Sequence, residues 1–260
     1  MPSSIAEWDR AEVQRSAGEA SRVDASRLLA DESQLERYLH PLADTCHPLE
    51  YSHYLLGDVR GKTVLDYGCG GGFNSLVLAR RGARVVALDI SPDLIAIARR
   101  RMVANRIRSG VEFVIGSAHE VPVGDESVDV VFGMAILHHL HLAVASREVK
   151  RVLRQGGRAI FREPVRNSPV LQAARKLIPY QEAHVSRFER PLTDRELSGF
   201  AVGYSSFRAK AFSLPSTRVL RLLPLVRRYV HVFDRCDAAL LQRFPRLKHY
   251  AALRVIELVK

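Results

Sequence analysis

The sequence lacks the features that mark a membrane-spanning or exported protein. None of its apolar runs reaches the roughly 18 residues that a membrane-spanning helix requires, and its first residues contain no hydrophobic stretch typical of a secretory signal. It has only three cysteines, Cys46, Cys69 and Cys236, far apart in the chain. Neither a disulfide framework nor a Cys-x-x-Cys metal site is therefore expected. These absences predict a protein of the reducing cytoplasm.

The chain also lacks internal repeats and low-complexity tracts. Hydrophobic residues make up 47% of its 260 residues, which is normal for a globular protein and too many for a disordered one. This length suits one α/β domain with additional helices, or one domain with a small cap.

Acidic residues are scarce in one part of the chain. The formal net charge is +11, and residues 208–248 contain ten basic residues against two acidic ones. In some proteins such a segment binds nucleic acid, an anionic membrane surface or an acidic substrate, and in others it is only a solvated helix face. Composition leaves these interpretations open.

Apolar runs alternate with helical patterns through the middle of the chain. Because the β-like runs contain few polar residues, the alternation predicts an α/β fold, a parallel sheet with helices on both faces. Helices are expected over 73–81, 92–105 and 144–153, with Ser91 as the N-cap of the second and a turn at 155–157. The predicted strands are 63–67, 84–89, 111–115, 128–133, 158–162, 206–214 and 251–259.

The flanking segments are predicted to be mainly helical. Residues 1–56 are interrupted at Pro41 and Pro48 and are expected to form two or three helices that act as a lid. Residues 57–260 then form the core. Further helices are expected over 168–179 and 192–200, and residues 215–248 form a helical insertion, broken at Pro224, before the last strand.

A glycine-rich turn follows the first predicted strand. It has the spacing Gly68-x-Gly70-x-Gly72, with Asp66 before it and Asp89 at the end of the second strand. Glycines let the backbone approach a ligand, and a carboxylate at the end of the second strand suits the two hydroxyls of a ribose. The last gap is one residue shorter than in the dinucleotide fingerprint, which argues against a pyrophosphate. The alternative is a purely structural turn in which the acids act as caps.

Several segments, in the right order, resemble one enzyme family. Residues 64–72 (VLDYGCGGG) and 86–92 (VALDISP) are similar to the donor-binding motifs of the class I S-adenosylmethionine-dependent methyltransferases of the small-molecule, "methyltransferase domain 11" type. Residues 113–118 (FVIGSA), 127–132 (SVDVVF) and 151–158 (RVLRQGGR) resemble the family's later motifs. The resemblance implies a seven-stranded Rossmann-like open sheet, S-adenosylmethionine as the methyl donor and S-adenosylhomocysteine as the product.

The resemblance also implies which residues hold the donor. Asp66 would lie near the methionine amino group or orient the turn, Asp89 would bind the ribose, and Ile90 would pack against the adenine. Ser117 stands where many relatives carry Asp, and its hydroxyl would accept more weakly from the adenine amino group. The full set is Asp66, Gly68, Cys69, Gly70, Asp89, Ile90, Ser117, Ala118 and Met134.

Catalytic candidates follow the fourth and fifth strands. Residues just after strand four face the donor methyl group in this fold, and this chain has His138 and His139 there. A histidine has a pKa suited to a general base, although one of the pair is expected to be structural. Glu163, at the end of strand five, would orient the acceptor, act as a base or make only a loop contact. His119 is expected to be exposed.

Aromatic and imidazole side chains gather in the lid. They would contact the donor or acceptor, or only pack the lid against the core. The residues are Tyr38, His40, His47, Tyr51 and Tyr54.

The acceptor is expected to be a small molecule. No Asn-Pro-Pro-Tyr type motif follows strand four, which argues against methylation of nucleic-acid bases, and no acidic or cysteine cluster indicates a metal. The basic, leucine-rich insertion favours a lipophilic acceptor (quinone-, isoprenoid- or lipid-like) with peripheral contact to an anionic membrane, or a secondary metabolite beneath a cap. The third hypothesis is a non-catalytic protein that binds S-adenosylmethionine or RNA, although no stable nucleic-acid partner is expected.

Overall fold

The computed structural model describes residues 4–21, 28–169, 188, 190–215 and 230–260. Most of the helix expected over 168–179, the break at Pro224 and the arginines of 216–229 lie outside these residues. In the part of the chain that the structure describes, no helix is both long and apolar enough to cross a membrane.

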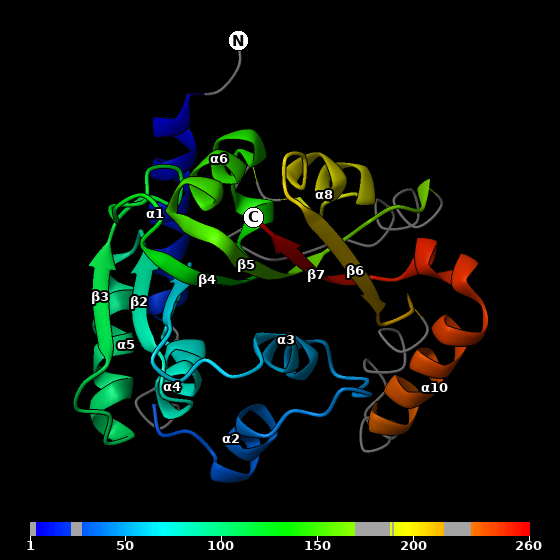
Figure 1. Cartoon of the computed structure of the whole chain (residues 1–260), viewed down its shortest axis with the longest axis horizontal. Helices are drawn as coiled ribbons and strands as arrows, with labels where there is room; N and C mark the ends of the chain where they lie inside the picture. The colour runs from blue at the N-terminus through cyan, green and yellow to red at the C-terminus, as the bar shows by residue number, and fades with distance from the viewer. Residues whose placement is uncertain (1–3, 22–27, 170–187, 189, 216–229) are drawn as a thin grey trace.

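A seven-stranded sheet lies at the centre of the molecule, as the sequence predicted (Figure 1). The strand order is β3-β2-β1-β4-β5-β7-β6. β1 to β5 pair in parallel, whereas β7 is antiparallel to both β5 and β6. The strands are β1 (Thr63–Tyr67), β2 (Arg84–Asp89), β3 (Val111–Ile115), β4 (Val128–Met134), β5 (Leu153–Pro164), β6 (Ser206–Phe212) and β7 (Leu253–Val259).

The parallel pairing predicted from the strand–helix alternation is confirmed for β1 to β5, whereas β7 runs in the opposite direction. Phe212, at the end of β6, pairs with Leu253, at the start of β7. The chain therefore enters β7 at the same end of the strands at which it left β6, and β7 must run antiparallel to both of its neighbours. The pattern of apolar residues indicates that a strand exists, but it does not report the edge from which the chain enters.

The turn expected at residues 155–157 lies inside β5. Val128 of β4 pairs with Leu153, and Val130 pairs with Arg158, so the register shifts between them. The additional residues on β5 form an irregularity within the strand, and Gly156 adopts a φ of +72° there. β5 therefore begins five residues earlier than the apolar run suggested.

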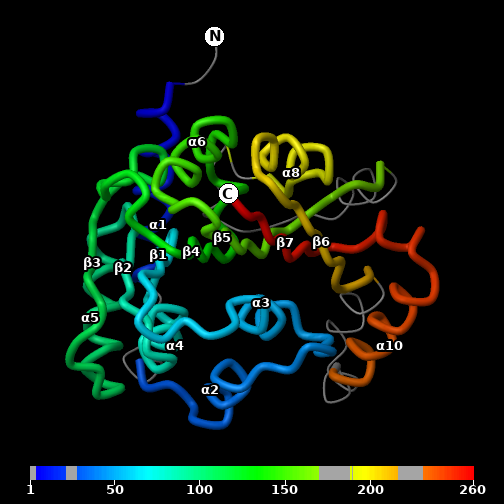
Figure 2. Tube along the Cα trace, viewed as in Figure 1, coloured from blue at the N-terminus to red at the C-terminus, as the bar shows by residue number. Residues whose placement is uncertain are grey.

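Helices cover both faces of the sheet (Figures 1 and 2). α3, α4 and α5 lie on one face, α6 and α8 lie on the other, and α10 lies beyond the β6 edge. Ser91 caps α5 as predicted, since its hydroxyl accepts a hydrogen bond from the backbone N–H of Leu94 (3.3 Å). The helices are α1 (Ile5–Ala20), α2 (Glu32–Leu39), α3 (Pro48–Leu56), α4 (Phe73–Arg80), α5 (Pro92–Ala104), η2 (Leu137–His139), α6 (Leu142–Val152), α8 (Asp194–Phe200), α10 (Val230–Arg243) and η4 (Pro245–Tyr250).

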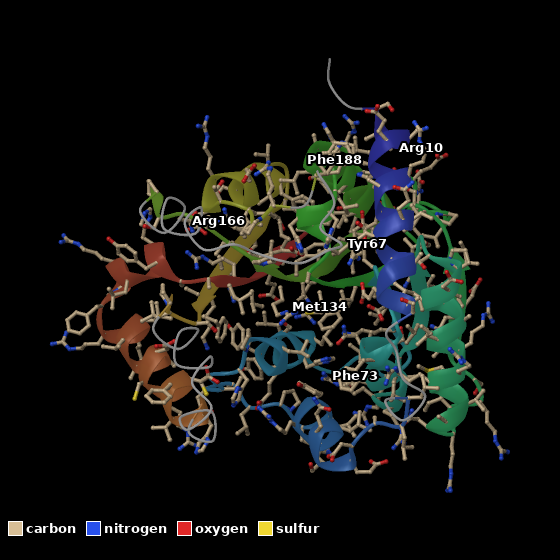
Figure 3. The ribbon with its side chains drawn as sticks, turned by 180° about the vertical axis from the view of Figure 1, so that it is seen from behind. Arg10, Tyr67, Phe73, Met134, Arg166 and Phe188 are labelled. Atoms are coloured by element: carbon tan, nitrogen blue, oxygen red, sulfur yellow. The ribbon has the colours of Figure 1, made fainter. Side chains whose placement is uncertain are left out.

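The two faces of the sheet have separate hydrophobic cores. Along β4 and β5, Phe132 and Ile160 pack on the α3 face, whereas Val131 and Phe161 pack on the α6 face. This alternation is what a strand buried on both faces requires, because successive side chains point in opposite directions. Because of this alternation, the side chain of Met134, at the carboxyl end of β4, lies on the α3 face (Figure 3).

Candidate functional site

The glycine turn between β1 and α4 has the shape that its sequence requires. Gly72 has a φ of +78°, and a Cβ atom there would lie 2.7 Å from the Cβ of Ala98 in α5. Gly70 has a φ of +51°, and a Cβ there would meet no atom within 4 Å. Gly72 therefore allows the two helices to approach each other, whereas Gly70 borders open space in which a ligand can contact the backbone.

The carboxylate of Asp89 is fixed at the end of β2, next to that open space. Its Oδ2 accepts from the backbone N–H of Gly70 (2.8 Å) and its Oδ1 from that of Ser91 (2.9 Å). Burial raises the pKa of Asp89, and the nearby charges of Glu12 and Glu19 raise it further. Each oxygen keeps a second lone pair, so the oriented carboxylate can still accept from two ligand hydroxyls.

A cavity of about 460 Å³ opens at this edge of the sheet, a volume typical of small-molecule sites. Four carboxylates and two guanidinium groups line it within the described part of the chain, so its wall favours a cation. An oriented carboxylate, an open glycine backbone and a negative wall fit the sulfonium-bearing donor that the sequence resemblance implied. These charged residues are Asp9, Glu12, Glu19, Asp89, Arg15 and Arg101.

One wall of the cavity is α1. The sequence predicted a helical lid over residues 1–56 but not which of its helices lies at the site. Trp8, Glu12, Arg15 and Glu19 all line the cavity. Their spacing puts them on one face of the helix, and α1 begins with a capping box at Ser4. A charged stripe at helical spacing was the available signal, but the sequence does not show which part of the sheet that stripe faces.

His119 is buried, so the prediction that it is exposed was wrong. Its Nε2 accepts from the backbone N–H of His141 (2.9 Å), and its Nδ1 lies 2.8 Å from Oδ1 of Asp9 in α1. Because Nε2 is an acceptor, Nδ1 carries the proton and donates to the carboxylate. This pair fastens α1 to the loop after β3, a contact across 110 residues of sequence.

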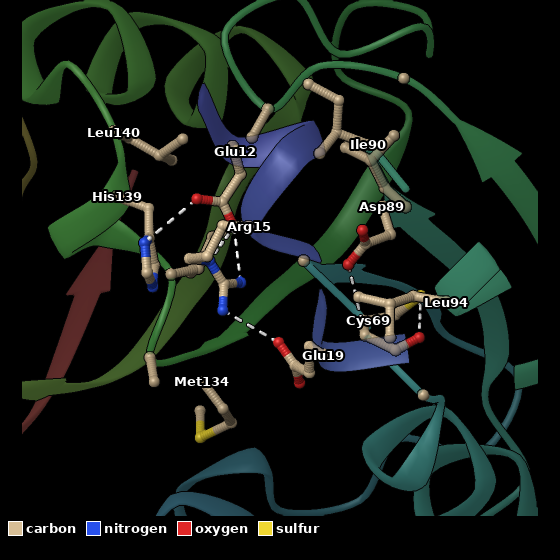
Figure 4. A pocket seen from close by; sticks show the side chains of 18 of the residues that line it. Glu12, Arg15, Glu19, Cys69, Asp89, Ile90, Leu94, Met134, His139 and Leu140 are labelled. Carbon is tan, nitrogen blue, oxygen red and sulfur yellow. Dashed lines mark hydrogen bonds and ion pairs between the residues drawn. The ribbon is translucent and has the colours of Figure 1, made fainter. Parts of the chain in front are cut away.

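His139 lines the cavity and pairs with α1 as well (Figure 4). Its Nδ1 lies 3.2 Å from Oε2 of Glu12, and the guanidinium of Arg15 donates to the other carboxylate oxygen of Glu12. Burial alone would raise the pKa of Glu12, but the hydrogen bonds and charges of His139 and Arg15 outweigh burial and lower it to about 2. Glu12 therefore stays ionised beside the imidazole.

His138 lines the cavity beside His139, but its Nδ1 faces the sheet. It lies 2.8 Å from Oε2 of Glu163, whose other oxygen accepts from the backbone N–H groups of Ile136 and Leu137 (both 2.9 Å). Glu163 is completely buried and does not line the cavity. Its position favours neither direct acceptor binding nor a base; it holds the turn after β4 and orients His138.

The predicted donor residues divide into two groups. Asp66 lies beneath the turn, where its Oδ2 accepts from the hydroxyl of Ser75, and burial raises its pKa to about 7. Ser117 accepts from the backbone N–H of His119 (3.0 Å), and neither Asp66 nor Ser117 lines the cavity. Those that do are Gly68, Cys69, Gly70, Asp89, Ile90, Ala118 and Met134.

The aromatic and imidazole residues of 38–54 do not line the cavity. Tyr38 packs on His53 and Phe73, and Tyr51 packs on Tyr54 and Phe212. These contacts favour packing of the helices as their role. Within the described residues, no group of three or more His, Cys, Asp or Glu is placed to hold a metal ion.

Comparison with known proteins gives consistent matches to methyltransferases. The model of a methyltransferase-domain family matches residues 65–161. A fatty-acid O-methyltransferase of Mycolicibacterium smegmatis is 36% identical over 136 residues, 51% of this chain and 46% of that protein. A ubiquinone biosynthesis O-methyltransferase of Xanthomonas oryzae pv. oryzae is 31% identical over 144 residues, 52% of this chain and 59% of that protein. The chain thus spans about half the length of the curated relatives it matches.

The solved structures agree with this match at the level of the fold. An S-adenosylmethionine-dependent methyltransferase from Mesorhizobium loti superposes with a TM-score of 0.57 at 18% identity, over 85% of this chain and 100% of that one. At this identity the likeness concerns the fold alone.

Proposed function

Because the chain belongs to the class I S-adenosylmethionine-dependent methyltransferases, we propose that it transfers the methyl group of S-adenosylmethionine to a small-molecule acceptor and releases S-adenosylhomocysteine. The observation that carries this proposal is the carboxylate of Asp89, oriented by the backbone of Gly70 and Ser91 at the wall of a negatively charged cavity.

Binding of the donor depends on residues already in place. Asp89 would accept from the two ribose hydroxyls, Ile90 and Ala118 would flank the adenine, and the backbone at Gly70 would contact the amino-acid part, since all four residues line the cavity. The donor supplies an electrophilic methyl group on a sulfonium. Glu12 and Glu19 lower the energy of a positive charge in the cavity, and α1 excludes water from it as part of an N-terminal lid.

We further propose that His139 is the general base and that Glu12 positions it. Glu12 lies at Nδ1 of His139, so the proton of a neutral imidazole is held on Nδ1 and Nε2 keeps its lone pair. In Figure 4 the second ring nitrogen lies on the side of Met134. Nε2 accepts the proton of the acceptor as its oxygen or nitrogen attacks the methyl group, and the Glu12 carboxylate stabilises the imidazolium that forms.

The acceptor is proposed to be lipophilic, with a secondary metabolite as the alternative. Phe73, Met134, Ile136 and Leu140 give the cavity an apolar part beside the histidines. The names of two relatives, a fatty-acid and a ubiquinone-biosynthesis enzyme, also favour an apolar acceptor.

A surface at α10 and η4 supports a peripheral contact with an anionic membrane. Leu240, Phe244 and Tyr250 are exposed there, and Phe244 has 52% of its surface accessible. Arg243 and Arg246 are exposed beside them. Apolar side chains flanked by arginines are the combination that binds an interface of anionic lipid.

The proposed function is tested by transfer of a labelled methyl group from S-adenosylmethionine into an extract of the source cells. We expect label in an organic-solvent phase, as a lipophilic acceptor requires. Label in the aqueous phase indicates a secondary metabolite instead. Label on nucleic acid or protein, or donor binding without transfer, contradicts the proposal and favours a binding protein.

A further inference from the structure

One arginine of the central sheet, Arg162, makes no hydrogen bond or ion pair through its side chain with the part of the chain that the structure describes. Arg162 lies near the carboxyl end of β5 and its side chain is half-buried. Its Nε is buried and accepted by no atom, and no hydrogen bond or ion pair joins its guanidinium to a residue of the described part. Burial lowers the pKa of Arg162, although the nearby carboxylate of Glu163 acts in the opposite direction. A half-buried guanidinium whose Nε–H has no acceptor costs stability, so its presence calls for a role.

Arg158, four positions earlier on the same face of β5, shows what a structural arginine does in this sheet. Its terminal nitrogens donate to the carbonyl oxygens of Leu55 and Leu56 at 3.0 and 2.8 Å, and it pairs with Glu257 at 3.3 Å. Arg158 thus fastens α3 to the sheet. Arg162 makes none of these contacts, although α3 crosses the same face.

The position of Arg162 places it beside the cavity. Met134 is its register partner on β4, and the backbone N–H of Ala135 donates to the carbonyl of Arg162 (2.8 Å). Paired residues on neighbouring strands carry their side chains on the same face. Met134 lines the cavity and lies on the α3 face, opposite to Tyr67 (Figure 3). Arg162 is not one of the residues that line the cavity, but the register places its side chain beside Met134, on the β5 side.

Glu163 makes no ion pair with Arg162, although its negative charge is near enough to act on the arginine. It is the next residue on the strand, so it points to the other face, and its oxygens already accept from the turn after β4 and from His138. In contrast, the acids around the donor cavity pair with Arg15 and His119 or hold the glycine turn. Arg101, the other arginine of the cavity wall besides Arg15, donates to the carbonyl oxygens of Gly71 and Leu28, whereas the Nε–H of Arg162 has no acceptor among the described residues.

We propose that Arg162 binds an anionic group of the acceptor, a carboxylate or a phosphate, and so selects acidic lipophilic acceptors over neutral ones. A guanidinium presents planar donors that match either anion in a bidentate contact, and the contact is strong where water is excluded. The inference rests on the proposed function, because it takes the space beside Met134 as the acceptor site.

The binding test does not require turnover. The full chain, loaded with S-adenosylhomocysteine, is titrated in a calorimeter with decanoate, decyl phosphate and decanol. We expect one or both anions to bind, and Arg162→Gln to weaken that binding at least tenfold while decanol binding and S-adenosylhomocysteine affinity stay unchanged. Arg162→Lys keeps the positive charge but loses the planar pair of donors. Its affinity for the anions is therefore expected to lie between those of the wild type and Arg162→Gln. Arg208→Gln, which removes an exposed arginine of β6, is the matched control.

A stability measurement separates this role from a structural one. Replacing a half-buried arginine that makes no ion pair with an apolar side chain of similar length removes its desolvation cost, so Arg162→Met is expected to keep or raise the thermal midpoint. A lowered midpoint would indicate a structural arginine and overturn the proposal. Failure of both anions to bind the wild type, or equal binding by Arg162→Gln, would overturn it too. Failure to bind S-adenosylhomocysteine would instead contradict the proposed function.

Discussion

Asp89 shows how a single carboxylate is prepared for its ligand. Two backbone N–H groups already orient it, so little rearrangement is needed when ribose hydroxyls arrive. We expect Asp89→Ala to weaken S-adenosylhomocysteine binding at least tenfold, since charge-assisted hydrogen bonds are worth about 1.5–3 kcal/mol. The only tryptophan of the chain, Trp8, lines the cavity, so its fluorescence reports binding. Asp58→Ala, in an exposed pair with Arg60, is the control, and an unchanged dissociation constant would refute the ribose assignment.

The proposed general base, His139, leads to a second prediction about a single residue. We expect His139→Asn to reduce methyl transfer by about 10²-fold or more, with S-adenosylhomocysteine affinity retained, because a positioned base contributes roughly 10²–10⁴-fold. Glu12→Gln is expected to lower turnover less, since the imidazole stays but loses the carboxylate at Nδ1. Transfer rates are compared with those of His141→Asn, an exposed neighbour. Normal turnover in His139→Asn would remove this residue from the mechanism.

Asp66 provides a prediction about pH. Its folded-state pKa of about 7 exceeds the usual 3.8, so the folded protein keeps a proton that the unfolded chain releases. Stability therefore falls as pH rises from about 4 to about 7. Asp66→Asn removes this titration. The difference between the unfolding free energies of the variant and the wild type is therefore expected to shift in favour of the variant by about 2–3 kcal/mol from pH 5 to pH 8. Denaturant unfolding at the two pH values measures the change, and a constant difference would contradict it.

Among the secondary-structure elements, α1 has contacts that could not be predicted from the sequence. Helical spacing predicts a helix with a polar face, but the partners of that face, His119 and His139, lie more than 100 residues away. Only the folded sheet brings the loops after β3 and β4 to α1. In contrast, the proximity of the glycine turn to Asp89 was predictable. The two lie at the carboxyl ends of β1 and β2, which are neighbours in a parallel sheet of this kind.

The α10 and η4 surface leads to a prediction of its own. We expect the protein to sediment with vesicles of phosphatidylcholine and phosphatidylglycerol, and much less with phosphatidylcholine alone, because arginines and exposed apolar groups act together. Phe244→Ser is expected to weaken this association several-fold by removing an exposed ring. Val202→Ser, an exposed apolar residue just after α8, is the control. Equal sedimentation of all variants with both vesicles would exclude a specific membrane contact at this surface.

For the whole molecule, the seven strands and the helices between β1 and β5 were predicted from apolar periodicity alone. The direction of β7, the irregularity in β5 and the burial of His119 were not, because each depends on contacts between distant segments. The same limit applies to the charges. Periodicity placed Arg162 in a strand, but only the folded sheet shows that it lies beside Met134 and that its Nε–H has no acceptor in the described part of the chain.

The place of β7 also determines when this sheet can be completed during synthesis. β6 has no neighbour except β7, and β7 follows it by about 40 residues in the chain. While the ribosome is still translating residues 213–252, β6 is an unpaired strand and the outer edge of β5 stays open. Both expose backbone donors and acceptors that favour aggregation. Chaperone dependence and slow translation should therefore affect the yield of this protein through one late step, the arrival of residues 253–259.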